Sequence, residues 1–502
     1  MEPLLAGLSM LLDLSTIGAI VFGVLVGVLV GALPGLSSPM AIALLIPFTI
    51  SMQPAAAIAM LAALYCAGTF GGSITAILIN APGAPPAAAT ALDGYPMAKR
   101  GEAGRALGIS AFSSVVGGLI GLMILLLAAP ALARFAVKFT SAEYFALALF
   151  ALSMLASVSG KSSIRNLIAG AVGVLISTIG LHLTTGVERF TFGLPDLQEG
   201  LHFVPVLIGL FAIGEMLNQA RVGDVLYERI RANVIRLPSW DDLRRIKYTI
   251  LRSSGIGTFV GILPAEGATV AAIMGYNEAR RWSSRKEEFG TGVPEGIAGP
   301  ESANNAATGG AMVPTLALGI PGSTSTALIL GAMIMHGLKP GPFLLQNQPD
   351  FLYAIFGAMI LANITFLAVG LGGAKIFSQV TLIPRTILWP SVFVLAMIGS
   401  YAAASSLFDV WVMLISGILG YFMLRFGFGP APLIMGLILG SIIEENFSKA
   451  MIIHENSVLS MLERPLVLLF FVLTAVSLIS PVWSALRARR REKKLLAVTE
   501  GE

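Results

Sequence analysis

The sequence predicts an all-α, polytopic membrane protein, and three observations indicate this class. Of the 502 residues, 56% are hydrophobic and only 12% are charged, whereas ordinary soluble domains have about 25% charged residues. Long runs without Asp, Glu, Lys or Arg, such as residues 14–92, 302–338 and 466–486, each hold at least one stretch of the ~20 apolar residues that cross a bilayer. Residues 119–127 (LIGLMILLL) are apolar on every side, whereas the strands of a membrane barrel alternate apolar and polar positions. We therefore expect roughly ten to thirteen transmembrane helices.

A basic central segment divides the chain into two halves. Residues 221–252 contain eight basic and four acidic residues, and the tail holds the basic run RARRREKK. Lys and Arg beside membrane spans mark the cytoplasmic side, so we expect both segments to be cytoplasmic rather than bound to nucleic acid. The expected organisation is a first transmembrane repeat (1–220), the connector (221–252), a second repeat (253–486) and a basic C-terminal tail (487–502). The N-terminus lacks a basic stretch, so a cleaved signal peptide is not expected.

Residues 280–288 (RRWSSRKEE) do not fit a simple topology. They contain four basic and two acidic residues, yet a single crossing after the connector would place them outside. Either the helix after Arg252 turns back, or this loop contacts a partner subunit.

Two sequence elements recur in the same order in both halves. The pattern G-x-x-x-G-x-L-P occupies residues 27–34 and 257–264, and a Gly pair followed by an apolar stretch and a Pro-Gly break occupies residues 71–83 and 309–322. Internal repeats with Gly/Pro-interrupted hydrophobic segments are typical of secondary transporters and of their binding sites. The ridge Gly23, Gly27 and Gly31 indicates close helix packing.

The Pro-Gly breaks are expected to end helices inside the membrane. Pro82 and Pro321 lack an amide proton and clash with the preceding turn. Broken helices persist in a bilayer only where they face protein or a water-filled cavity, and an exposed helix N-terminus suits an anion. The alternative is that both segments are ordinary kinked spans.

Uncharged polar side chains cluster at both breaks. Hydroxyl and amide groups can bind a carboxylate, or replace the water around Na⁺, without adding a fixed charge. The residues at the first break are Ser73, Thr75, Asn80 and Thr90, with the carboxylate of Asp93 just beyond. Those at the second are Ser302, Asn304, Asn305, Thr308, Thr315, Ser323, Thr324, Ser325 and Thr326, together with the carboxyl group of Glu301. A Na⁺ site near Asn304 and Asn305 is the one metal site that we expect.

Two carboxyl groups are candidates for ion coupling. Glu266 follows Leu263-Pro264 in an apolar context, and Glu301 follows Pro300 at the edge of the polar cluster. A carboxylate inside a membrane costs at least ~2.5 kcal/mol on insertion scales, so it should be paired, protonated or functional. Glu301 could equally be a residue of the membrane interface.

No enzyme site and no cofactor site are expected. The four histidines, His182, His202, His336 and His454, do not have the spacing of metal ligands. Residues 160–162 (GKS) resemble the end of a P-loop, but they lack its first glycine and its strand-loop-helix context.

Several longer runs resemble one family. They are residues 31–36 (GALPGL), 71–78 (GGSITAIL), 82–83 (PG), 90–96 (TALDGYP), 300–306 (PESANNA), 314–323 (PTLALGIPGS) and 336–342 (HGLKPGP). Together they resemble the large membrane subunit of the bacterial tripartite tricarboxylate transporters, over about residues 14–486.

This resemblance implies a function and a set of partners. Such proteins import citrate-like or other organic carboxylates across the inner membrane by symport with Na⁺ or H⁺, and their two halves are thought to be inverted repeats. They work with a small membrane subunit of about four helices and a periplasmic solute-binding protein that delivers the substrate.

The resemblance also implies which residues bind the substrate. They are Ser73, Thr75, Asn80, Pro82 and Gly83 in the first half, and Asn304, Asn305, Thr315, Pro321, Gly322, Ser323 and Thr324 in the second. One departure concerns the second repeat, which commonly reads Leu-Pro-Gly-x-Gly in this family. Here the run is Leu263-Pro264-Ala265-Glu266-Gly267, so a side chain stands where the backbone would approach the ligand most closely.

Two other classes of protein compete with a transporter. A channel or uniporter for small anions would use the Gly/Pro breaks as a filter, although channels usually repeat one filter around a symmetric oligomer and this chain has two unequal breaks. An integral membrane enzyme would need a convergent base, nucleophile or metal set, which we do not find. Which carboxylate is carried is not readable from the sequence.

Overall fold

The computed structural model describes residues 2–155, 163–182, 184–221, 230, 235–264, 267–373 and 385–480. These residues are mostly helical, with only two strands of two residues each among them, which confirms the predicted fold class. The chain forms two compact units, a large unit of Met1–Val137 and His202–Phe422, and a small unit of Lys138–Leu201 and Met423–Glu502. Each unit takes segments from both halves of the chain, so the division into two sequence repeats stays a prediction. The basic tail 487–502 and Glu266 lie outside the described residues.

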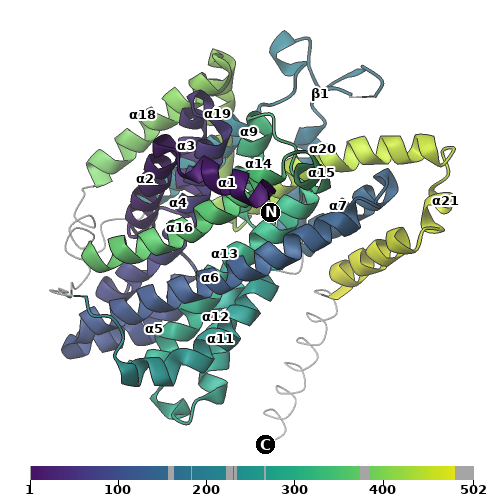
Figure 1. Cartoon of the computed structure of the whole chain (residues 1–502). Coiled ribbons are helices and arrows are strands. Elements are labelled where there is room, and N and C mark those ends of the chain that lie inside the picture. The colour runs from purple at the N-terminus through teal and green to yellow at the C-terminus, as the bar shows by residue number, and fades with distance from the viewer. Residues whose placement is uncertain are drawn as a thin grey trace, which may run out of the picture. The chain divides into compact units, whose positions relative to one another are not determined.

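The large unit begins with the helices of the first half (Figure 1). They are α1 (Glu2–Leu11), α2 (Leu14–Gly31), α3 (Ser38–Leu45), α4 (Pro54–Ile79), α5 (Ala87–Met97) and α6 (Ala103–Ala136), with a 3₁₀ turn at Ile46–Ser51 and a π turn at Ala98–Glu102. The second segment holds α9 (Phe203–Ile208), a π turn (Gly209–Ile213), α10 (Gly214–Arg221), α11 (Trp240–Ile262), α12 (Gly267–Trp282), a 3₁₀ turn (Lys286–Glu288), α13 (Pro294–Leu318), α14 (Thr324–Met335), α15 (Pro342–Asn347), α16 (Pro349–Gly372), α18 (Arg385–Ala404) and α19 (Leu407–Phe426).

The small unit holds α7 (Ser141–Met154), α8 (Ser163–Ser177), a 3₁₀ turn (Pro195–Leu197), α20 (Pro430–Ile453), α21 (Val458–Leu462) and a further helix, Pro465–Ser480. Its two short strands, β1 (Gly180–Leu181) and β2 (Glu188–Arg189), pair antiparallel with Gly180 opposite Arg189. Its apolar core includes Ala146, Ala450 and Met461.

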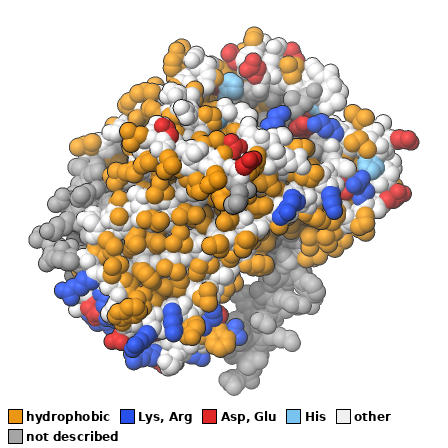
Figure 2. All heavy atoms as spheres, viewed as in Figure 1, with side chains coloured by type: hydrophobic (Ala, Val, Ile, Leu, Met, Phe, Trp, Pro, Cys, Tyr) orange, Lys and Arg blue, Asp and Glu red, His pale blue; other side chains and the backbone are white. Residues whose placement is uncertain are grey.

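Seven helices within the described residues are long and apolar enough to cross a membrane. They span Leu14–Gly31, Pro54–Ile79, Ala87–Ala136, Phe203–Arg221, Pro349–Gly372, Thr386–Ala404 and Leu407–Phe426. Across the large unit, hydrophobic side chains form a broad face with few charges, and Lys and Arg side chains gather along its lower edge (Figure 2). This arrangement is that of a multi-pass membrane protein, whose apolar surface faces lipid tails.

Glycines set the packing of α2 against α4. A Cβ atom on any of three glycines would lie within 3 Å of a carbonyl oxygen on the other helix. The pairs are Gly27 with Leu64 (2.7 Å), Gly31 with Gly68 (2.4 Å) and Gly71 with Val28 (2.6 Å). No larger residue fits without moving one backbone, so the two helices meet through bare backbone, as the glycine ridge predicts.

The same contacts recur between α11 and α13. The pairs are Gly257 with Ala303 (2.1 Å), Gly261 with Ala307 (2.5 Å) and Gly310 with Thr258 (2.3 Å). Each contact residue on α11 has a residue number 230 higher than its counterpart on α2 (257 against 27). Each contact residue on α13 has a residue number 239 higher than its counterpart on α4 (303 against 64). Two constant offsets over three contacts mean that the two helix pairs are packed in the same register.

The helix after Arg252 turns back, as the first of the two interpretations of residues 280–288 predicts, whereas a contact of this loop with a partner subunit stays a prediction. α12 packs against α11, and the Arg252 side chain lies 3.8 Å from the Glu278 carboxylate and over the Trp282 ring. The chain therefore returns after Ile262 to the level of Arg252. The ten residues of α11 that follow Arg252, up to Ile262, extend about 15 Å. This part of the hairpin is therefore about half as long as the ~30 Å hydrocarbon core is thick.

At the end of α11 away from the turn of the hairpin, a capping box begins the helix, and its Asp242 also holds α6. The Asp242 carboxylate accepts hydrogen bonds from the Ser239 backbone N–H (3.1 Å) and from the Arg105 guanidinium (2.5 and 3.2 Å). Burial by itself raises the pKa of Asp242, but the hydrogen bonds from Arg105 and Ser239 outweigh it and hold this pKa below its ordinary value.

Candidate functional site

The first predicted break ends α4 as expected. Asn80 takes the left-handed conformation (φ 52°) that terminates a helix, and the backbone N–H groups of Asn80 and Ala81 both donate to the Thr75 carbonyl. The Gly83 N–H then donates to the Gly72 carbonyl (3.3 Å), which folds the loop back along α4. Asn80 and Pro82 are exposed, whereas Gly83 is buried.

The second break has the same construction. Gly319 ends α13 in the left-handed conformation (φ 71°), and the N–H groups of Gly319 and Ile320 donate to the Pro314 carbonyl. The Gly322 N–H then donates to the Thr315 hydroxyl (3.2 Å), which itself donates to its own helix at the Ala311 carbonyl. In both breaks the residue two places after the left-handed position is proline, which cannot extend the helix.

Ser323 begins the next helix, α14, with a capping box. Its hydroxyl accepts a hydrogen bond from the Thr326 N–H (3.2 Å), and the Thr326 hydroxyl accepts one from the Ser323 N–H (2.8 Å). Thr324 is the first residue of α14 and is half-buried. The N-terminus of α14 thus points into the second break with polar groups around it.

Helix α4 connects the two halves of the predicted site. The Tyr65 hydroxyl lies 3.3 Å from the Ser323 hydroxyl, and the Asn304 amide donates to the Thr69 carbonyl (3.4 Å). Within the described chain no hydrogen bond joins the two break loops directly: Gly83 approaches α2, whereas the second break contacts α4. The structure therefore brings Ser323 and Asn304 together with α4, and leaves Asn80 and Pro82 at the surface of the large unit.

Glu301 is fully buried and is surrounded by hydroxyl groups. Its side chain accepts hydrogen bonds from Thr90 on α5 (2.5 Å) and Ser114 on α6 (2.7 Å), and its exposed fraction is 0%. Ser110 also lies close to this carboxyl group and is 2.7 Å from Ser73 on α4. A chain of hydroxyls therefore leads from the first break to Glu301. Glu301 therefore lies within α13, which begins at Pro294, and is enclosed by protein rather than exposed at its surface.

Three buried amide groups have unused oxygens. Asn305 and Asn363 donate hydrogen bonds to carbonyls of their own helices (3.1 and 2.8 Å), and Asn304 donates to α4. The Oδ1 atoms of all three are buried and have no hydrogen-bond partner in the described part of the chain. Buried polar atoms are rarely left unpaired, so such oxygens are candidates for a ligand or an ion. Oxygen donors of this kind suit a hard cation.

The sequence did not single out four residues of this network as site residues. Tyr65, Ser110, Ser114 and Asn363 lie in charge-free stretches of the sequence, where a lone hydroxyl or amide usually bonds its own helix backbone. One usable signal was the spacing of Ser110 and Ser114, which places two hydroxyls on one face of a helix.

Asp93 joins the two halves of the chain structurally. Its carboxylate is fully buried and accepts hydrogen bonds from the backbone N–H groups of Gly290 (2.9 Å), Gly292 (2.8 Å) and Val293 (3.0 Å). The Tyr276 hydroxyl donates a fourth (2.9 Å). Asp93 on α5 thereby fixes the chain that enters α13, which carries Glu301 and both asparagines.

Long apolar helices, two Gly/Pro helix breaks, and a buried group of hydroxyls, amides and one carboxyl group in the same unit are the features of a membrane transport protein. The family described as "Tripartite tricarboxylate transporter TctA family" matches residues 17–435, and the chain belongs to it. It is therefore a transporter subunit of a system that has other subunits.

Two relatives from Agrobacterium vitis are similar to this chain. One is described as an uncharacterised 52.8 kDa protein in the TAR-I ttuC' 3' region, and it is 37% identical over 449 residues, or 89% of each chain. The other, an uncharacterised protein in the TAR-II ttuC' 3' region, is 36% identical over 234 residues, which are 47% of this chain and 97% of that protein. No solved structure matches the chain.

Proposed function

We propose that this chain is the transport subunit of a binding-protein-dependent secondary importer, which moves tricarboxylates or related organic carboxylates across the bacterial inner membrane. This proposal rests on the two helix breaks, which have the same construction. The second break contacts α4 through Ser323 and Tyr65. The family adds the tripartite organisation. In this proposal the two repeats are inverted, the C-terminus is cytoplasmic, and the partners are a small membrane subunit of about four helices and a periplasmic binding protein.

The substrate carboxylate binds at the N-terminus of α14. The helix dipole and the backbone N–H groups of the first turn that the capping box does not use favour an anion there, and the hydroxyls of Ser323 and Thr324 add donors without a competing fixed charge. Thr315 holds the Gly322 N–H in place (3.2 Å) and so shapes the loop rather than the ligand contact.

Coupling to an ion uses one of two arrangements in the same region. A Na⁺ ion would take the unpaired amide oxygens of Asn304 and Asn305. A proton would reside on Glu301, whose hydroxyl neighbours can donate to a carboxylate or accept from a carboxylic acid. Glu266 stays a second candidate for the proton, since in the sequence it lies between α11 and α12.

Uptake into vesicles that contain both membrane subunits, with binding protein and labelled carboxylates outside, tests the proposal. We expect saturable uptake that requires the binding protein and either a Na⁺ or an H⁺ gradient, each varied separately. Glu301→Gln should abolish a dependence on the H⁺ gradient if the proton is coupled there. Glu445→Gln is the control, because its exposed carboxylate only pairs with Lys449 one turn away. Uptake with neither gradient would instead identify a uniporter or channel.

A further inference from the structure

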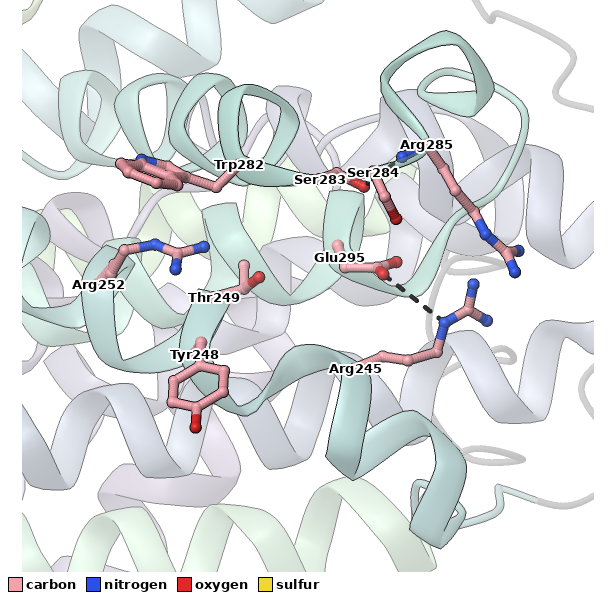
Figure 3. A pocket seen from close by; sticks show the side chains of 9 residues that line it. All are labelled: Arg245, Tyr248, Thr249, Arg252, Trp282, Ser283, Ser284, Arg285 and Glu295. Atoms are coloured by element: carbon pink, nitrogen blue, oxygen red, sulfur yellow. Dashed lines mark hydrogen bonds and ion pairs between the residues drawn. The ribbon is translucent and has the colours of Figure 1, made fainter.

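A second polar site lies far from the helix breaks in the sequence, at the open end of the α11–α12 hairpin. It is a pocket of about 330 Å³ between α11, the end of α12 and the start of α13 (Figure 3). The residues that give it its character are Arg245, Arg252, Arg285, Tyr248, Ser283 and Ser284. Glu295 is the one acidic residue that lines the pocket, against three arginines.

The three arginines have unused hydrogen-bonding capacity. Their nearest carboxylates lie at 3.7 Å (Arg245 with Glu295), 3.8 Å (Arg252 with Glu278) and 3.5 Å (Arg285 with Glu288). Charge-assisted hydrogen bonds are about 2.7–2.9 Å long. These contacts are longer, so they are ion pairs without a hydrogen bond. The Arg252 Nε atom is buried and has no hydrogen-bond partner among the described residues.

The guanidinium groups are also positioned for an anion. Arg252 lies over the Trp282 ring, 5.4 Å from its centroid, which fixes one face of the group and leaves its edge available. Arg245 and Arg285 extend toward each other on the opposite side of the pocket, with Ser283 and Ser284 above (Figure 3). A guanidinium group is planar and has parallel N–H donors, so it can bind two oxygens of one phosphate.

An apolar surface begins directly beside this pocket. Leu251 and Phe259, two turns apart on α11, are 59% and 67% exposed. Gly255 lies between them, and a Cβ atom there would meet nothing within 4 Å, so the surface has a notch. Tyr248 and Trp282, both exposed, border the pocket. Basic, aromatic and apolar side chains in this order are typical of a membrane interface, where basic pockets between helices bind phospholipid head groups.

We propose that this pocket binds the phosphate of an anionic phospholipid, with an acyl chain along the Leu251–Phe259 surface of α11. The phosphate chemistry alone would also fit free inorganic phosphate. The adjoining apolar notch favours the lipid, because a small soluble anion has no apolar part that could contact it. The site is independent of the carboxylate path and of the proposed transport function.

Thermal unfolding of the delipidated chain in detergent tests the proposal. Phosphatidylglycerol should raise the melting temperature of the wild type, whereas phosphatidylcholine should raise it much less. The double variant Arg245→Gln/Arg252→Gln should bind phosphatidylglycerol at least tenfold more weakly. Arg281→Gln is the matched control, because it removes the same charge from the end of α12 but does not line the pocket.

A second variant covers the case in which the double substitution impairs folding. Ser284→Glu changes one exposed loop residue and places a carboxylate among intact arginines, so it should weaken phosphatidylglycerol binding by a similar factor. An unchanged lipid response in Ser284→Glu, or in a folded double variant, would overturn the proposal. So would equal stabilisation by millimolar inorganic phosphate, since the site would then take free phosphate.

Discussion

Replacing Gly83 by Ala tests the first break by steric means alone. Gly83 has no left-handed φ angle, so alanine fits its backbone conformation. Its Cβ atom would, however, lie 1.9 Å from the Gly31 carbonyl oxygen. Reaching the ~3.0 Å of an ordinary close contact requires the loop or the end of α2 to move by about 1.1 Å. Misplacement by ~1 Å around a reacting or bound group can cost about 10²-fold in activity, and overpacking costs about 1–3 kcal/mol in stability.

We therefore expect Gly83→Ala to lower carboxylate uptake into vesicles at least tenfold while the protein still folds. Gly322→Ala should have a smaller effect, because its Cβ atom would lie 2.6 Å from the Ala311 carbonyl and needs a shift of only about 0.4 Å to reach the same ~3.0 Å contact. Gly18→Ala is the control, since nothing lies within 4 Å of its Cβ position. Uptake by Gly83→Ala within twofold of the wild type would refute the argument that this loop must lie against α2.

The remaining predictions concern the site and the stability of the large unit. Asn305→Ala and Ser323→Ala should each reduce uptake tenfold or more, on the order of 1.4 kcal/mol, at normal expression; normal uptake in both would place the site elsewhere. Asp93→Asn replaces a charged acceptor of three backbone hydrogen bonds, so the melting temperature should fall, by an amount corresponding to about 1.5–3 kcal/mol; no change would mean that α13 is fixed by other contacts. The folded pKa of Asp242 is lowered, so its stabilisation is complete above its ordinary pKa of about 4 and is lost as the pH falls through the lower, folded value. The melting-temperature difference between wild type and Asp242→Asn should accordingly be constant at neutral pH and shrink in acid.

The parts of the fold that follow from backbone chemistry could be predicted from the sequence. Proline and glycine restrict or free the backbone wherever they stand, so Pro82 and Pro321 located both helix breaks, and the glycine ridge located a helix crossing. The same reasoning could not show that Gly257 and Gly261 pack as Gly27 and Gly31 do, because the partner residues on α13 are mostly alanines.

The polar network was harder to predict because a hydroxyl in a helix has a local alternative. Ser302 and Thr315 do bond their own helices, whereas Ser114 turns to Glu301 on another helix. Only the packing of α6 on α13 decides between these outcomes, and a single sequence does not contain that packing. Asn363 lies in a helix that the repeat pattern did not mark, so its unpaired oxygen could be found only in three dimensions.

The glycine contacts also bear on how such a protein could move. Between α2 and α4, and between α11 and α13, glycine lies against the backbone of the other helix at three successive contacts, so there are no long side chains whose rotamers could absorb a sliding motion. Interfaces of this kind are rigid, because any displacement drives one backbone into another. We therefore expect each helix pair to travel as one body during transport, with the bending confined to the loops and breaks between the pairs.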